Sequence, residues 1–194
     1  MRLGIVRVMR SRSSSSRTSP QQGIRHGNIR EFYETDGDEG SISRKFGSNG
    51  RVFTLSATGW SAVVEEIRIR FDSGAELLLF EMGQYYGTSL ALEIMKYEID
   101  YTKAVNGLLQ SASYSGWGKI SVKGDLPNGK DISVTVVDCI SCHEPNMRKS
   151  SCTFLRGMID GVAETLYGQP FKIRETRCMA SENDCCEFML EDNP

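Results

Sequence analysis

The stretch FKIRETRCMASENDCCEFMLE, residues 171–191, decides the fold that we predict for this chain. Its outer parts, 171–177 and 186–191, alternate apolar and polar residues, as a β-strand with one buried face does. The turn-forming segment ASEND lies between them, so we expect an antiparallel hairpin at this end of the chain.

Strand parity assigns the side chains of this hairpin to two faces, because successive residues of a strand point in opposite directions. Glu175 and Cys186 point toward the face that carries the apolar residues, whereas Cys185 points away from it. The inward set consists of Phe171, Ile173, Glu175, Cys186, Phe188 and Leu190.

Upstream segments supply the helices and strands that can pack on this hairpin. Because helices and hairpins occur without a β-α-β alternation, we predict an α+β fold, in which helices pack on one twisted antiparallel sheet. The predicted helices cover 60–71, 75–97, 100–113 and the segment from a Ser150 or Ser151 cap to Gly168, and the predicted strands cover 29–35, 51–57, 116–124 and 131–138.

The helix predicted over 75–97 is apolar on more than one face, which suggests that the rest of the fold encloses it. Gly83 and Gly87 lie one turn apart inside it. Two interpretations stay open: close packing of a second helix, or room for a ligand beside Met82, Tyr85 and Tyr86. Further along the chain, the pair Asn128-Gly129 predicts a type I′ turn between two strands, since both central positions of that turn need a positive φ.

The length of 194 residues fits one domain, which we place at 29–194. Residues 1–28 are rich in serine and arginine, and we expect this basic tail to be disordered. The first 30 residues hold seven arginines and no acid, so the remaining 16 bases and 25 acids give the body a net charge of −9. An acidic body argues against nucleic-acid binding. We find no signal peptide and no membrane span, and expect a reducing, cytoplasmic setting.

In such a compartment, cysteines bind metals more often than they form disulfides. Cys152 falls in the first turn of its predicted helix, where the helix dipole favours a thiolate. With Glu175, Cys178 and Cys186 it would offer four ligands of types that zinc accepts, which makes a closed, structural site. The alternative is a set of ordinary buried cysteines, with Glu175 exposed on an edge strand.

Cys139, Cys142 and His143 match the C-x-x-C-H pattern of c-type haem attachment. The lack of an export signal argues against that use. Free surface thiols, a second metal site and a redox-responsive pair are the other interpretations. No catalytic constellation can be assigned, so the sequence points to a binding protein and not to an enzyme.

The segment SCTFLRGMIDGVAETLYGQPFKIRETRCMASENDCCEF, residues 151–188, resembles the C-terminal signature of the 4-vinyl reductase domain family. The resemblance weakens upstream through EMGQYYG and GWG to about Arg51. It implies a fold related to TRAPP trafficking subunits and haem-based nitric-oxide sensors, with a cavity for a hydrophobic molecule. In the phenol-responsive members, a zinc ion is held by Cys, Glu, Cys and Cys, which correspond to Cys152, Glu175, Cys178 and Cys186 here.

The leading functional expectation is a stand-alone sensor or carrier domain for a hydrophobic or aromatic molecule, stabilised by zinc. No ATPase or DNA-binding domain follows, and no histidine here aligns with the sensors' phenol ligand. The alternatives are an accessory protein or reductase for a vinyl tetrapyrrole, and a TRAPP-like module that forms homodimers. The residues expected to contact the ligand are Met82, Tyr85, Tyr86, Met95 and Trp117.

Overall fold

The structure is a computed structural model that describes residues 33–36, 41–44, 51–96, 98, 100–142 and 152–192. The predicted tail at 1–28, the caps Ser150 and Ser151, and His143 lie outside the described residues. Within the described part of the chain, no helix combines the length and the apolar character needed to cross a membrane.

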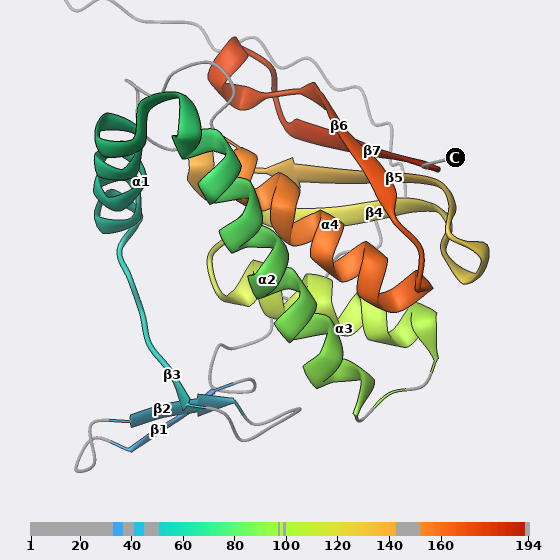
Figure 1. Cartoon of the computed structure of the whole chain (residues 1–194). Coiled ribbons are helices and arrows are strands. Elements are labelled where there is room, and N and C mark those ends of the chain that lie inside the picture. The colour runs from blue at the N-terminus through green and yellow to red at the C-terminus, as the bar shows by residue number, and fades with distance from the viewer. Residues whose placement is uncertain are drawn as a thin grey trace, which may run out of the picture.

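The main sheet has four antiparallel strands in the order β4-β5-β7-β6 (Figure 1). These strands are β4 (Lys119–Asp125), β5 (Lys130–Val137), β6 (Phe171–Arg177) and β7 (Cys186–Asp192). The predicted C-terminal hairpin is therefore confirmed, with Ile173 paired to Leu190. It joins the earlier hairpin through β5 and β7, where Val134 pairs with Phe188.

Helices pack on one face of this sheet, as the predicted α+β class requires (Figure 1). The helix α4 (Thr153–Tyr167) lies between the sheet and α2 (Ala75–Met95), and α3 (Tyr101–Tyr114) contacts both α2 and β4. The helix α1 (Ala57–Phe71) lies to the side and contacts α2.

Strand parity is confirmed on the inner face of the sheet. Phe188 and Cys186 of β7 are fully buried, and the side chains of β5 alternate between buried and less buried positions. Together with the apolar stripe of α4 they form the main core. Its buried members include Ile132, Val134, Val136, Leu155, Met158, Phe171 and Leu190.

A second, small antiparallel sheet consists of β1 (Tyr33–Asp36), β2 (Ser41–Arg44) and β3 (Arg51–Val52). The strand predicted over 51–57 is thus wrong beyond Val52. Ser56 instead caps α1, because its hydroxyl accepts a hydrogen bond from the Gly59 N–H at 3.0 Å.

Close contact between α2 and α4 explains the glycines of α2. A Cβ on Gly83 would lie 2.0 Å from the Phe154 carbonyl oxygen, and one on Gly87 would lie 2.1 Å from that of Met158. The close-packing interpretation is therefore confirmed. The expectation that α2 is enclosed is wrong, since only this side packs on α4 while Leu77 and Tyr85 are 63% and 77% exposed.

The turn between β4 and β5 also differs from the predicted type I′ geometry. Leu126–Asn128 form a short 3₁₀ turn, and Gly129 alone takes the left-handed conformation, with φ 67°. Pro127, whose ring holds φ near −65°, suits the 3₁₀ turn. The Asn128 amide donates a hydrogen bond to the Asp125 carboxylate at 2.7 Å, which stabilises this geometry.

Candidate metal centre and apolar cavity

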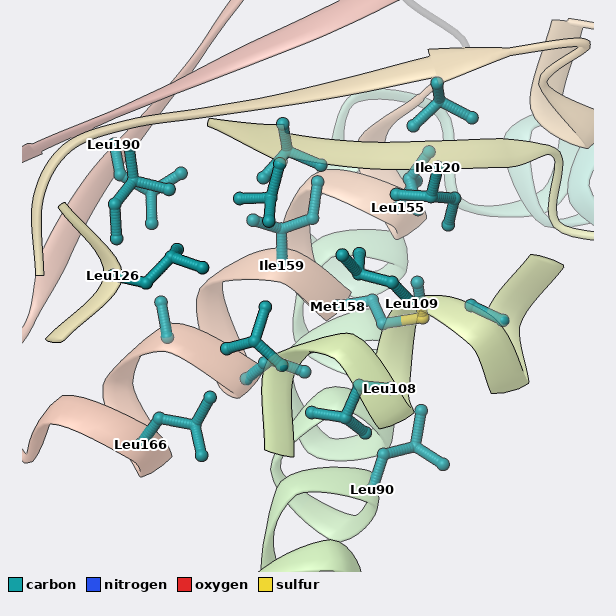
Figure 2. A pocket seen from close by; sticks show the side chains of 18 of the residues that line it. Leu90, Leu108, Leu109, Ile120, Leu126, Leu155, Met158, Ile159, Leu166 and Leu190 are labelled. Atoms are coloured by element: carbon teal, nitrogen blue, oxygen red, sulfur yellow. The ribbon is translucent and has the colours of Figure 1, made fainter. Parts of the chain in front are cut away.

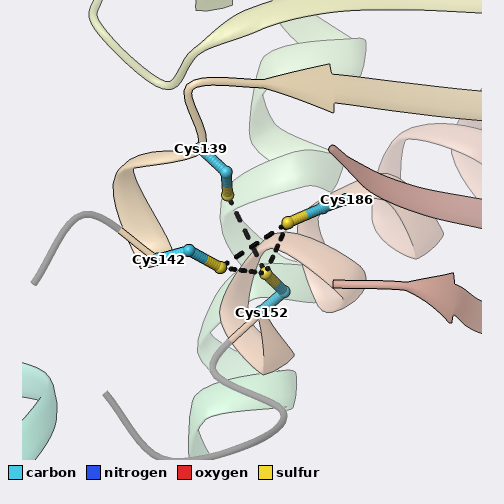
Figure 3. A group of neighbouring side chains, drawn as sticks. All are labelled: Cys139, Cys142, Cys152 and Cys186. Atoms are coloured by element: carbon cyan, nitrogen blue, oxygen red, sulfur yellow. Dashed lines mark hydrogen bonds between the residues drawn. The ribbon is translucent and has the colours of Figure 1, made fainter. Parts of the chain in front are cut away.

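Five cysteine thiols from different elements meet at one end of the main sheet. Cys152 occupies the N-cap position of α4, Cys178 follows β6, and Cys186 begins β7. Cys139 and Cys142 lie on the turn that follows β5. Figure 3 shows the convergence of four of these side chains.

The thiols lie at the separations expected around a single metal ion. The sulfur of Cys152 lies 3.4 Å from that of Cys142, 3.5 Å from that of Cys186 and 3.9 Å from that of Cys178. All these cysteines are free, because a disulfide would bring two sulfurs to about 2.05 Å. Four sulfurs at ~2.3 Å from a tetrahedral zinc would be separated by about 3.8 Å.

Two four-donor groups have their ligand atoms within 4.8 Å of one another. One of them is the set predicted from the sequence, and the other includes the C-x-x-C pair. Sequence reasoning treated that pair as a separate problem, although its spacing is itself a zinc-ligand signal. The two groups are Cys152, Glu175, Cys178 and Cys186, and Cys139, Cys142, Cys152 and Cys186.

Glu175 tests whether the pocket suits a cation. Its Oε1 atom is buried and has no hydrogen-bond partner. Burial raises the pKa of this carboxyl group, while the thiols of Cys178 and Cys152 oppose the rise. A bound cation would satisfy the orphaned oxygen and favour the carboxylate, so the donors fit a metal ion.

Hydrogen bonds among the thiols divide their protonation states. The neighbouring thiols, Cys139 first, hold the pKa of the Cys142 thiol below its usual value. The same kind of contact, again with Cys139 first, raises the pKa of Cys152. Cys142 is therefore the preferred thiolate of this pair, and thiolates are the form that binds metals.

Neighbouring contacts position the start of α4, where Cys152 lies. The Thr153 hydroxyl donates a hydrogen bond to the Glu76 carboxylate of α2, which also pairs with Arg68 of α1 at 2.9 Å. Cys185 is buried next to Cys186 but belongs to neither four-donor group, as strand parity predicted.

An apolar cavity of about 100 Å³ lies between α3, α4 and the inner face of the sheet (Figure 2). The lining side chains include Leu108, Ile120, Val134, Met158 and Leu190. The hydroxyl of Tyr167, another lining residue, donates a hydrogen bond to the Leu126 carbonyl at 2.8 Å.

None of the five residues predicted to contact a ligand lines this cavity. Met82, Tyr85, Tyr86 and Met95 of α2 are at least 37% exposed, because the glycine side of α2 packs against α4 and leaves these side chains outside. The lining residues that prediction missed belong chiefly to α3, α4 and β5. Their signal was the apolar stripe of α4 and the alternation in β5.

Trp117 belongs instead to an aromatic group at the start of α4. Its ring stacks on Phe154 with centroids 5.5 Å apart, and Trp60 meets both rings edge-on. Tyr86 lies 6.1 Å from each of the same two rings. This group joins α1 and α2 to α4 through side-chain packing.

Comparison with known proteins confirms the family resemblance over the C-terminal part of the chain. Residues 132–192 match the 4-vinyl reductase domain. The uncharacterized protein MJ0150 of Methanocaldococcus jannaschii is 25% identical over 61% of this chain and 65% of its own length. For the uncharacterized protein MJ1642 of the same organism these values are 33%, 39% and 47%. The chain thus spans less than two thirds of either relative.

Solved structures confirm the fold relationship. The phenol-responsive sensory domain of the transcription activator PoxR has a TM-score of 0.69 at 15% identity, covering 84% of this chain and 86% of that one. An H-NOX protein from S. oneidensis has a TM-score of 0.52 at 16% identity, covering 77% and 83%. A trafficking protein particle complex subunit 3 from Naegleria fowleri has a TM-score of 0.50 at 14% identity, covering 71% and 93%.

Proposed function

We propose that this chain, whose residues 132–192 match the 4-vinyl reductase domain, binds a small apolar molecule as a sensor or carrier. The observation that carries the proposal is the cavity of about 100 Å³, which the core encloses with apolar side chains. Natural cores leave few voids larger than a water molecule, so a hollow of this size marks a place for a guest.

The chemistry of the lining limits the guest to a small apolar molecule. An apolar cavity of about 150 Å³ stays dry and binds benzene or xenon. The Tyr167 hydroxyl is engaged with the Leu126 carbonyl, so a hydroxyl on the guest would have to compete for it. A tetrapyrrole is far larger than this cavity, which argues against the reductase alternative.

The similarity of the fold to the PoxR domain supports the same class of function. That domain is phenol-responsive and was solved with phenol. The apolar lining leads us to expect that this chain prefers unsubstituted aromatic or aliphatic guests over phenol.

A zinc ion in the thiol cluster would stabilise the walls of the cavity. The predicted ligands Cys152, Glu175, Cys178 and Cys186 would hold it and leave no open position, so its role is structural. It would join the start of α4 to the β6–β7 hairpin, and α4 lines the cavity through Leu155 and Met158. Free thiols this close together imply a reducing compartment such as the cytoplasm.

Exposed apolar side chains on α1 and α2 favour a second role as a homodimer module. Ile69, Leu77 and Tyr85 are each more than 60% exposed. Apolar surface of this kind marks interaction sites.

Benzene titration by calorimetry tests the binding proposal. We expect saturable binding to the wild type, weaker binding of phenol, and at least about a tenfold loss of benzene affinity in Ala112→Leu, which fills the cavity from α3. Gln110→Leu is the matched control, because it adds the same side chain at an exposed position of α3. Absence of saturable benzene binding, or equal affinity in Ala112→Leu, would refute the cavity as the site.

A further inference from the structure

The turn that carries Cys139 and Cys142 is held in place on two sides. The N–H of Ile140 donates to the Trp117 carbonyl at 3.4 Å, and the N–H of Cys139 points to the Met179 sulfur at the same distance. Cys139 itself is 1% exposed. The turn is therefore part of the core, and the interpretation of these cysteines as free surface thiols is wrong.

Cys142 lies closer to the other thiols than any second-site interpretation allows. Its sulfur is 3.4 Å from Cys152, 3.5 Å from Cys186 and 3.7 Å from Cys178 (Figure 3 shows the first two). Cys152 is 3.5 Å from Cys186 and 3.9 Å from Cys178. Five edges of this four-sulfur figure thus measure 3.4–3.9 Å, close to the ~3.8 Å of a tetrahedral zinc–thiolate site.

We infer that Cys142 is the fourth ligand of the metal centre, in a site made of Cys142, Cys152, Cys178 and Cys186, and that Glu175 takes this position only when Cys142 is absent. The inference rests on the metal centre of the proposed function and changes its donor set. Both candidates complete the same trio of Cys152, Cys178 and Cys186. A tetrahedral ion has room for one of them, and soft thiolate ligands select zinc over the hard carboxylate.

This donor set would tie one more strand to the site. The trio alone links α4 to β6 and β7. Cys142 adds β5, whose Ile132, Val134 and Val136 line the cavity. With four thiolates, the ion would hold together the ends of three strands and the helix that encloses the cavity.

Cobalt(II) substitution of the full chain tests the assignment, because thiolate-to-cobalt charge-transfer absorbance reports the number of bound thiolates. We expect wild type and Glu175→Gln to bind one cobalt with the same spectrum. Cys142→Ser should keep the metal through Glu175 but lose about a quarter of this absorbance. The double variant should bind cobalt at least about tenfold more weakly than either single variant.

Controls separate the inference from its premise. Cys185→Ser removes a buried thiol outside the cluster and should match the wild type. An unchanged spectrum in Cys142→Ser would overturn the inference alone, as would a loss of absorbance in Cys139→Ser in its place. A wild type that binds neither zinc nor cobalt would overturn the metal centre itself. Circular dichroism and benzene titration of each variant confirm that it has folded.

Discussion

Gly83 of α2 and Phe154 of α4 lie in backbone contact: a Cβ added to Gly83 would stand 2.0 Å from the Phe154 carbonyl oxygen. The contact is reciprocal, since a Cβ on Gly157 of α4 would stand 2.0 Å from the Phe80 carbonyl oxygen of α2. Backbone atoms cannot rotate away as a flexible side chain can. The two helices therefore pack at a separation that only glycine permits at these positions.

Gly83→Ala should lower the free energy of unfolding by about 1–3 kcal/mol or more, because the added methyl group must push the helices apart. Gly74→Ala is the control: its Cβ would meet nothing within 4 Å, and its φ of −81° suits alanine. That change should be neutral or stabilise by up to about 1 kcal/mol. Urea denaturation measures both, and equal stability of the two variants would contradict the observed packing.

Cys178→Ser should release the bound zinc and lower the free energy of unfolding by more than about 2 kcal/mol, since metal binding contributes folding energy. Cys178 completes the trio shared by both proposed donor sets, so neither Cys142 nor Glu175 alone can replace it. Elemental analysis and thermal unfolding provide the two measurements. Cys185→Ser should change neither, and loss of metal there would show that its neighbour Cys186 is the wrong choice.

Asp160 should make stability depend on pH. Burial raises its pKa, although the Gln84 amide donates a hydrogen bond to its Oδ2 at 2.8 Å and partly offsets the rise. A raised pKa means that the folded state binds the proton more tightly. The associated stability is present below the unfolded pKa of about 4 and is lost as pH rises through the folded pKa.

Asp160→Asn keeps the acceptor for Gln84 and removes the titration. Relative to wild type, this variant should gain stability as pH rises above about 4 and then level off. Denaturant titrations at a series of pH values measure the difference. Glu81→Gln, at an exposed position of α2, should show no such trend. A difference between Asp160→Asn and wild type that is constant with pH would contradict the assignment.

Local patterns predicted the elements well, because periodicity and turn chemistry act over a few residues. The alternation around Phe188 placed Cys186 in the core, and the glycine at 168 ends α4 in the left-handed conformation. The type I′ turn failed because Pro127 and the Asn128–Asp125 hydrogen bond stabilise a different local geometry.

Long-range placement could not be predicted in the same way. The aromatic and methionine side chains of α2 gave a reasonable set of ligand contacts, yet they lie outside the cavity because glycine contacts determine which side of α2 faces α4. The C-x-x-C pair gave no sign of its partners, which follow it by at least ten residues.

The sequence by itself determined the α+β class, the terminal hairpin, and the inward direction of Glu175 and Cys186, since each depends on side-chain periodicity within one element. Only the tertiary structure decided that Cys142 meets Cys152, Cys178 and Cys186, and that the cavity lies between α3, α4 and the sheet. The reason is physical: the packing of α2, α3 and α4 on the sheet depends on contacts between distant segments, and these contacts leave no periodic signal in the chain.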